Sequence, residues 1–237
     1  MKLAKRAFLS TVPVLTGYVI LGIGFGILLS EQGYGFGWSF AMSALIYAGS
    51  MQYVALELIR SGASLATFAL TTLMVNARHL FYGISMIDKY KGVGKCKPYL
   101  IFGLTDETYS LVCADPPADV VQEKRTAYWL LVTLFDHAYW ITGCVLGSLL
   151  GTLLPEEFTA GLDFALTALF ITVFVDQWMK TKRHLPAVVG AAASVVSLLI
   201  FGQDSFLIPA MIFIVATLLI MPRAKKDRPA EGGDGRD

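Results

Sequence analysis

Apolar blocks long enough to span a membrane run through almost the whole chain, and they constrain its fold more than any other feature. A helix needs about 20 apolar residues to cross roughly 30 Å of hydrocarbon. Only 16% of the residues are charged, whereas about a quarter is typical of a soluble domain. The chain is therefore predicted to be an all-α, polytopic membrane helix bundle. Its apolar segments lie at residues 7–29, 38–59, 63–87, 98–114, 126–150, 164–179, 185–201 and 206–221.

The same pattern predicts the domain organisation and excludes several classes of function. Residues 1–222 are expected to form a single transmembrane domain, followed at 223–237 by a disordered tail rich in charge, Gly and Pro. A net charge of +1 gives no reason to expect nucleic acid as a partner. The three cysteines are too scattered for a disulfide framework or a zinc site, and neither an HExxH nor a Walker A motif is present. We therefore expect neither an enzyme nor a bound cofactor or metal.

Lysine and arginine collect at four places and predict the orientation of the chain. They precede the first segment, fill the loop 88–97, recur at 180–184 and begin the tail. The stretches 30–37, 151–163 and 202–205 contain no lysine or arginine. Because basic loops stay on the cytoplasmic side of a membrane, both termini and both basic loops are expected to face the cytoplasm.

This orientation conflicts with the number of apolar segments. Three segments separate the N-terminus from loop 88–97, and three more separate this loop from 180–184. If both ends of such a trio lie on the same side of the membrane, the chain between them must cross an even number of times. One segment in each trio should then turn back: 98–114 in the second trio, and 38–59 or 63–87 in the first. Broken or re-entrant segments are tolerated where they line a cavity and are typical of transporters. Alternatively, one basic loop departs from the rule and the chain crosses seven or eight times.

Small residues recur at a spacing that favours close helix packing. Gly143, Gly147 and Gly151 form a double GxxxG pattern, and Gly22 and Gly26 form another. Such spacing lets two helix backbones approach closely. The glycines either pack helices within the chain or form an interface with a partner or a second copy.

An arginine stands in the middle of the third apolar segment, where lipid is the expected solvent. In the stretch TTLMVNARHLFYGISM, a helical wheel places Asn76, Arg78, His79 and Tyr82 on one half and apolar side chains on the other. Charged side chains inside a membrane are costly and usually face a cavity or a partner. The polar half is therefore a candidate binding surface; a polar network that only fixes helix packing would give the same pattern.

The motif TDETYS brings two adjacent carboxylates into the short fourth segment. Asp106 and Glu107 point about 100° apart on a helix, and the neighbouring hydroxyls fill the remaining directions, so no face suits lipid. The carboxylates could pair with Arg78 and so reduce the cost of burying it, or could carry a proton. The alternative is a loop at the membrane surface.

Two further polar clusters lie within apolar segments. The motif YAGSMQY has a Gly-Ser step that can break a helix, with Tyr47, Ser50 and Gln52 as candidate binding residues. The motif FDHAYW places Asp136 beside His137, and histidine changes charge near physiological pH, so this pair is a candidate proton relay. Either cluster could instead be purely structural.

Three of these stretches together resemble a known family. In their order and separation, YAGSMQYVALELI, MVNARHLFYGISM and LTDETYSL are similar to the AzlC-type large subunit of bacterial branched-chain amino acid exporters. The resemblance implies a multi-pass protein of the bacterial cytoplasmic (inner) membrane that exports valine, leucine, isoleucine and sometimes methionine, driven by the proton motive force. It also implies a small AzlD-type membrane subunit as partner. The C-terminal third of the chain adds only hydropathy to this resemblance.

The polar residues fit the chemistry of such a substrate. A zwitterionic amino acid needs a cation for its carboxylate, an acid or carbonyls for its ammonium group, and an apolar pocket for its side chain. Arg78 and Asn76 suit the carboxylate, and Asp106 or Glu107 suits the ammonium group or the coupling proton. A non-transporting scaffold subunit, suggested by the double GxxxG, is the alternative. The other candidates are Tyr47, Ser50, Gln52, His79 and Tyr82 for the substrate, and Asp136 and His137 for the proton.

Overall fold

All regular elements in the described part of the chain are helices, as the sequence predicts. The computed structural model describes residues 3–154, 184–202 and 206–220 and a few positions between 167 and 179, and none of these residues lies in a strand. The chain divides into two units, Met1–Val175 and Asp176–Asp237, and each is described by itself. The predictions for most of segment 164–179, for the basic residues 180–183 and for the tail 223–237 lie outside the described residues.

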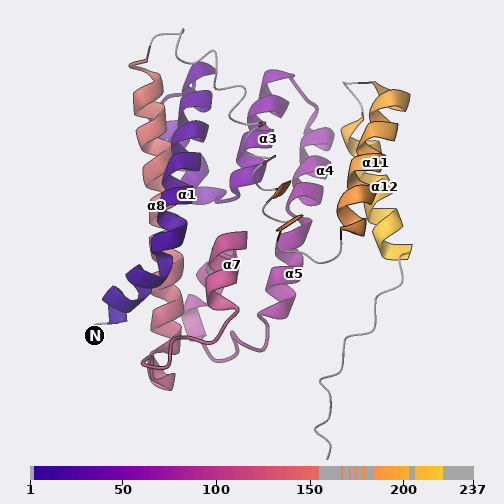
Figure 1. Cartoon of the computed structure of the whole chain (residues 1–237). Helices are drawn as coiled ribbons and strands as arrows, with labels where there is room; N and C mark the ends of the chain where they lie inside the picture. The colour runs from indigo at the N-terminus through magenta and orange to yellow at the C-terminus, as the bar shows by residue number, and fades with distance from the viewer. Residues whose placement is uncertain are drawn as a thin grey trace, which may run out of the picture. The chain divides into compact units, whose positions relative to one another are not determined.

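Two long helices, α1 (Leu3–Glu31) and α8 (Arg125–Gly151), lie side by side in the first unit and run in the same direction (Figure 1). Near their starts the hydroxyl of Tyr128 donates a 3.0 Å hydrogen bond to Ser10, and at their ends Gly151 packs against Ser30. Both are long and apolar enough to cross a membrane. We call the end of the unit where α1 and α8 start the basic end, and the opposite end the far end.

Glycines bring the backbones of α1 and α8 into direct contact. A Cβ atom on Gly26 would lie 2.1 Å from the carbonyl oxygen of Cys144, and one on Gly147 would lie 2.1 Å from that of Ile23. No side chain fits at such distances unless the helices move apart. The two GxxxG patterns therefore pack against each other within the chain, which is the internal alternative of the two that the sequence left open.

The second apolar segment is broken near its middle and turns back. Helix α2 (Phe36–Leu45) runs inward from the far end, and α3 (Gly49–Arg60) returns to it (Figure 1). The side-chain amide of Gln32, just after α1, donates a 3.2 Å hydrogen bond to the carbonyl of Leu56, so α3 ends beside the end of α1. The reversal includes Tyr47, whose φ of 42° is uncommon for a residue other than glycine. The break precedes the predicted Gly-Ser step, which instead begins α3.

The fourth apolar segment forms a second hairpin, which enters from the basic end. Helix α6 (Lys97–Phe102) runs inward and α7 (Asp106–Val112) runs back. The ammonium group of Lys89, before α6, donates a 2.6 Å hydrogen bond to the carbonyl of Ala114, after α7. Both ends of the segment therefore lie together, as expected for a segment that does not cross.

The third apolar segment crosses the unit from the far end to the basic end in two pieces. Helices α4 (Leu65–Val75) and α5 (Ala77–Ser85) follow one another and are separated at Asn76 (Figure 1). The hydroxyl of Ser64 caps α4 by accepting a 3.1 Å hydrogen bond from the backbone N–H of Thr67. The chain thus runs from one end of the unit to the other with a helix break at its midpoint.

Within residues 3–154, α1, α4–α5 and α8 run from end to end and two hairpins turn back. The N-terminal part of α1 and loop 88–97 therefore share the basic end, where Arg6 forms a 3.1 Å ion pair with Asp119. This is the arrangement that the parity of the basic loops predicts, with the second and fourth segments turning back. The number of crossings of the whole chain stays a prediction. Short 3-10 turns at Gly94–Cys96 and Gln122–Lys124 complete the basic end.

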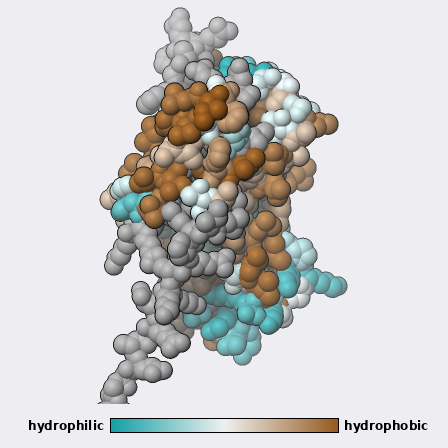
Figure 2. All heavy atoms as spheres, turned by 90° about the vertical axis from the view of Figure 1, so that its right-hand side faces the viewer, coloured by the Kyte–Doolittle hydropathy of each residue, from teal (hydrophilic) through white to brown (hydrophobic). Residues whose placement is uncertain are grey.

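Apolar side chains cover the outer face of α5. Leu80, Phe81 and Ile84 expose 61%, 69% and 64% of their surfaces, and this is the apolar half that the helical wheel predicts. In Figure 2 a group of hydrophilic side chains lies at the lower end, where Figure 1 places the loop after α5. An apolar side above a charged end suits a protein whose side faces lipid.

The second unit is described from two apolar helices that pack against each other, α11 (Leu185–Phe201) and α12 (Leu207–Ile220). Pro186 lies in the first turn of α11, where its missing N–H costs no helical hydrogen bond. Gly202 ends α11 with a φ of 71°, a left-handed conformation that favours glycine.

The hairpin arrangement predicts which loops share a side of the membrane. In a Cys96→Ser, Cys113→Ser background, Lys91→Cys and Glu123→Cys should both react with a membrane-impermeant maleimide from one side, because both positions are exposed at the basic end. Ser61→Cys, exposed after α3 at the far end, should react only from the other side. Labelling of Lys91→Cys and Glu123→Cys from opposite sides would contradict the hairpin formed by α6 and α7.

Candidate functional site

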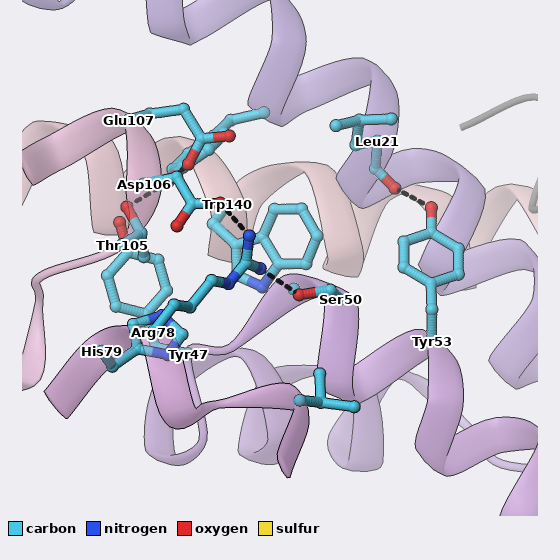
Figure 3. A pocket seen from close by; sticks show the side chains of 13 residues that line it. Leu21, Tyr47, Ser50, Tyr53, Arg78, His79, Thr105, Asp106, Glu107 and Trp140 are labelled. Carbon is cyan, nitrogen blue, oxygen red and sulfur yellow. Dashed lines mark hydrogen bonds and ion pairs between the residues drawn. The ribbon is translucent and has the colours of Figure 1, made fainter. Parts of the chain in front are cut away.

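The breaks between α2 and α3, between α4 and α5, and between α6 and α7 meet around a cavity inside the first unit (Figure 3). Its volume is about 340 Å³, within the range of roughly 300–1,000 Å³ typical of small-molecule sites. Its lining includes residues from α1 and α8 as well as from the three broken segments. The lining residues are Tyr18, Leu21, Tyr47, Gly49, Ser50, Tyr53, Val75, Arg78, His79, Thr105, Asp106, Glu107 and Trp140.

Arg78, in the first turn of α5, forms an ion pair with Asp106 at the start of α7 (Figure 3). Its guanidinium also donates a 2.5 Å hydrogen bond to the hydroxyl of Ser50, at the start of α3. Tyr82 donates to the other carboxylate oxygen of Asp106 at 2.8 Å. The pair therefore ties together the starts of three helices. The Nε atom of Arg78 is buried and has no hydrogen-bond partner among the residues that the structure describes. The predicted pairing of Arg78 with a carboxylate is confirmed for Asp106.

Glu107 turns away from this pair and contacts α1 instead. The hydroxyl of Tyr18 lies 2.8 Å from a carboxylate oxygen of Glu107 and 2.5 Å from the hydroxyl of Thr105. Thr105 also caps α7, because its hydroxyl accepts a 3.2 Å hydrogen bond from the backbone N–H of Thr108. Two adjacent carboxylates thus have separate partners, as their angular separation on a helix requires.

Apolar and aromatic side chains form the rest of the wall. They are Leu21 from α1, Tyr53 from α3, Val75 at the end of α4 and Trp140 from α8 (Figure 3 labels all but Val75). The hydroxyl of Tyr53 donates a 2.5 Å hydrogen bond to the carbonyl of Leu21, which joins α3 to α1. A Cβ atom on Gly49 would lie 3.1 Å from the Trp140 ring, so a glycine at this position leaves room for the indole.

Three of the predicted substrate residues, Gln52, Asn76 and Tyr82, are not among the lining residues but form contacts with them. Gln52 is buried and accepts a 2.9 Å hydrogen bond from the indole N–H of Trp140. The backbone carbonyl of Asn76 lies 3.3 Å from Nδ1 of His79, and Tyr82 holds Asp106. Their contact with a substrate stays a prediction, but each of them holds a lining residue in place.

Asp136 and His137 are neighbours on α8 with different partners. Asp136 is fully buried and accepts a 2.8 Å hydrogen bond from the hydroxyl of Thr108. His137 lies 3.2 Å through Nε2 from the carbonyl of Ser43, and 2.9 Å through Nδ1 from the hydroxyl of Tyr99. Because a carbonyl only accepts, Nε2 carries a proton. The two side chains bond to different partners, since adjacent helix residues point about 100° apart, and their role in carrying a proton stays a prediction.

Sequence reasoning missed Tyr18, Tyr53 and Trp140, which all line the cavity. Each stands in an apolar segment, where an aromatic residue is most simply explained by packing. The polar atom on each ring could have indicated a role beyond packing, since a buried Tyr O–H or Trp N–H usually needs a hydrogen-bond partner.

The site offers one cation, two carboxylates, several hydroxyls and an apolar wall. In the parts of the chain that the structure describes, no three His, Cys, Asp or Glu side chains come together as metal ligands. A small zwitterion with an apolar side chain matches these groups in both charge and polarity.

Comparisons with known proteins agree with this chemistry. The family model described as AzlC protein matches residues 13–154. The branched-chain amino acid transport protein AzlC of Bacillus subtilis is 44% identical over 218 residues, which are 92% of this chain and 84% of that protein. Inner membrane protein YgaZ of Escherichia coli is 31% identical over 196 residues, 78% of each chain. An uncharacterised membrane protein of Haemophilus influenzae is 40% identical over 214 residues, 89% of this chain and 86% of the relative. No solved structure matches the chain.

The matched region contains the whole cavity, and the relatives are membrane proteins that include a transport protein for branched-chain amino acids. A membrane location and a transport role follow for this chain from these relatives and from its apolar helices. The chain belongs to the AzlC family.

Proposed function

We propose that this protein exports branched-chain amino acids across the bacterial cytoplasmic membrane in exchange for protons, and that the cavity is its substrate site. The observation that carries the proposal is the Arg78–Asp106 ion pair in the wall of a largely aromatic and apolar cavity. The name of the Bacillus subtilis relative supports the same substrate class.

The ion pair gives a zwitterion a partner for each of its charges. A substrate carboxylate accepts hydrogen bonds from Arg78, whose Nε donor is unused. The substrate ammonium group takes the place of the guanidinium beside Asp106, or lies beside Glu107, which also lines the cavity. Charge-assisted hydrogen bonds of this kind are about twice as strong as neutral ones. The pair opens to admit substrate, so Arg78 both holds the helix starts together and binds the carboxylate.

The rest of the cavity selects the side chain. Leu21, Val75 and Trp140 offer apolar surface to a branched aliphatic group. A further amide on the substrate would lose its water without gaining a partner there, at a cost of about 1–3 kcal/mol, and a further charge would cost more. Valine, leucine and isoleucine bring no such group into the cavity.

The proposed orientation follows the basic end. Lysines of the loop 88–97 and the first residues of α1 lie there, so this end is placed in the cytoplasm. We also propose that a small AzlD-type membrane subunit completes the transporter. Exposed apolar side chains of α2, among them Phe36 and Trp38, are available for lipid or for such a partner.

Valine efflux from loaded cells tests the proposal. Cells that lack valine export are loaded with a valine-containing dipeptide and then express this chain together with its small partner. Valine should leave these cells several-fold faster than cells with an empty vector, whereas glutamate released from a matched glutamate dipeptide should not. Unchanged valine efflux, with both proteins verified in the membrane, would refute the proposal.

The observation that suggested a non-transporting scaffold subunit no longer supports that alternative. It depended on the double GxxxG pattern as an interface for a partner, but these glycines pack against α1 of the same chain.

A further inference from the structure

A continuous row of oxygen atoms leads from the cavity to the buried face of α8. Oε2 of Glu107 lies 2.8 Å from the hydroxyl oxygen of Tyr18, which lies 2.5 Å from that of Thr105. The Thr105 hydroxyl lies 3.1 Å from that of Thr108, which lies 2.8 Å from Oδ2 of Asp136. We call these five side chains the oxygen chain. It joins two carboxylates through three hydroxyls, and it crosses from α7 to α1, back to α7 and on to α8.

The protons available to the oxygen chain can be counted. Four contacts separate the two carboxylates, and each contact needs one proton between its oxygen atoms to be a hydrogen bond. Three hydroxyls supply three protons, because each hydroxyl donates once. The fourth proton must sit on a carboxyl group. With it on Glu107, every hydroxyl donates toward Asp136; with it on Asp136, every hydroxyl donates toward Glu107.

We propose that Glu107 and Asp136 share a single transferable proton and that the hydroxyls of Tyr18, Thr105 and Thr108 carry it between them. The inference rests on the proposed function and names the path of its coupling proton. In the transfer, the proton on Glu107 passes to Tyr18, whose own proton passes to Thr105. The Thr105 proton passes to Thr108, and the Thr108 proton passes to Asp136. One O–H bond forms and one breaks at each hydroxyl, and the negative charge ends on Glu107.

The surroundings support one shared proton rather than two ionised carboxylates. Asp136 and Thr108 are fully buried, Tyr18 is 5% exposed, and Oδ1 of Asp136 has no hydrogen-bond partner in the part of the chain that the structure describes. Within the described residues, neither Glu107 nor Asp136 forms an ion pair. A buried charge without such a partner is costly, and a shared proton removes one of the two charges.

The other titratable groups around the oxygen chain are Arg78, His79, Tyr47 and His137, and of these the Tyr47 hydroxyl is buried without a hydrogen-bond partner among the described residues. At its cavity end, Arg78 is paired with Asp106, and His79 contacts the Asn76 carbonyl. At its α8 end, the Tyr47 ring lies 4.3 Å from the ring of His137. His137 is itself bonded to the hydroxyl of Tyr99 and to a backbone carbonyl. None of these groups interrupts the row of oxygen atoms.

The shared proton makes substrate and proton compete at the cavity. An ammonium group beside Glu107 favours the ionised carboxylate there, so the proton moves to Asp136. A proton on Glu107 removes the charge that attracts the ammonium group. Binding of one therefore disfavours the other at the same carboxyl, which is what exchange of an amino acid for a proton requires.

Proteoliposomes that contain the transporter and its small partner test the path. Exchange of labelled valine for unlabelled valine needs no net proton movement, whereas uphill valine transport driven by a pH gradient does. Thr108→Val removes one link at nearly constant volume, so exchange should persist while proton-driven transport falls at least tenfold. Thr108→Ser restores the hydroxyl and should restore coupling. Tyr139→Phe, which removes a hydroxyl bonded at 3.0 Å to Thr11 between α8 and α1, should keep both activities.

Infrared spectroscopy of the purified transporter, without any substrate, tests whether one of the two carboxyl groups is protonated. At pH 7 the wild type should show the C=O band of a protonated carboxyl group. The band should disappear in the Glu107→Gln, Asp136→Asn double variant and remain in Asp106→Asn. Absence of the band from the wild type, or normal proton-driven transport by folded Thr108→Val, would overturn the shared proton. Absence of valine exchange by the wild type would refute the proposed function instead. The infrared measurement uses no substrate, so it tests the shared proton independently of valine transport.

Discussion

Replacing either member of the Arg78–Asp106 pair should stop valine efflux, and replacing both should restore the fold without restoring transport. A single replacement such as Arg78→Gln leaves a carboxylate unpaired in the cavity. Removing one partner of a buried pair costs about 3–5 kcal/mol. Here we expect the single replacement to lower the free energy of unfolding by about 1–3 kcal/mol, because the two side chains are 37% and 28% exposed and water screens their charges. Each single variant should therefore be less stable and at least tenfold slower in efflux.

The double variant Arg78→Gln, Asp106→Asn separates binding from structure. It leaves no unpaired charge, and its amides can bond with each other and with Ser50, so the thermal transition in detergent should return close to that of the wild type. Transport should not return, because the cation for the substrate carboxylate is gone. Efflux by the double variant at the wild-type rate would show that the pair only fixes the helices.

A matched control for these variants lies outside the cavity. Arg60 pairs with Glu57 at 2.9 Å on the surface, where the side chains are 70% and 57% exposed. Exposed pairs contribute about 0–1 kcal/mol, so Arg60→Gln should leave both stability and efflux nearly unchanged. If Arg60→Gln reduced efflux as much as Arg78→Gln, loss of any arginine would explain the result and the site assignment would fail.

A single methyl group at the α1–α8 contact should also have a large effect. The Cβ atom of Gly26→Ala would lie 2.1 Å from the carbonyl oxygen of Cys144, and the backbone cannot rotate away as a flexible side chain can. Overpacking of this kind costs about 1–3 kcal/mol or more. At about 2–4 °C for each kcal/mol in a chain of this size, the detergent-solubilised protein should unfold several degrees lower, and less of it should accumulate in the membrane.

The control for Gly26→Ala lies on the same helix. A Cβ atom on Gly17 would have no neighbouring atom within 4 Å, so Gly17→Ala adds a methyl group in open space. Alanine also favours a helix over glycine by roughly 1 kcal/mol. Gly17→Ala should therefore be neutral or stabilising by thermal shift. Equal stability of Gly26→Ala and Gly17→Ala would mean that α1 and α8 do not touch as closely as described.

Much of the fold could be predicted from the sequence because it depends on the solvent and on charge counts. Long apolar blocks require helices, since a backbone in lipid must satisfy its own hydrogen bonds. The parity of basic loops favoured one segment of each trio turning back, without choosing between 38–59 and 63–87 in the first, and a hairpin is present in each trio. The polar face of α5 followed from the 100° turn per residue, and Leu80, Phe81 and Ile84 are exposed on its other face.

The partners of the polar residues could not be predicted in the same way. The sequence shows that Arg78 needs a counter-charge, but only the packing of α5 against α7 selects Asp106 over Glu107. Asp136 and His137 are adjacent along the chain but have partners on different helices. Asp136 bonds to Thr108 of α7, whereas His137 bonds to residues of α6 and of the end of α2. Tyr18 joins a carboxylate 89 positions away in sequence, and no local pattern indicates that contact.

By itself, then, the sequence determined the helical class and the residues too polar for lipid, because each depends on local periodicity or on water, lipid and charge. It left open which segment of the first trio turns back, and the structure selects the second segment. Only the tertiary structure decided that three helix breaks meet at one cavity and that three hydroxyls connect Glu107 to Asp136. The physical reason is range. A hydrogen bond needs its two heavy atoms within about 3 Å of each other, and whether two distant residues come that close is fixed by how the helices pack.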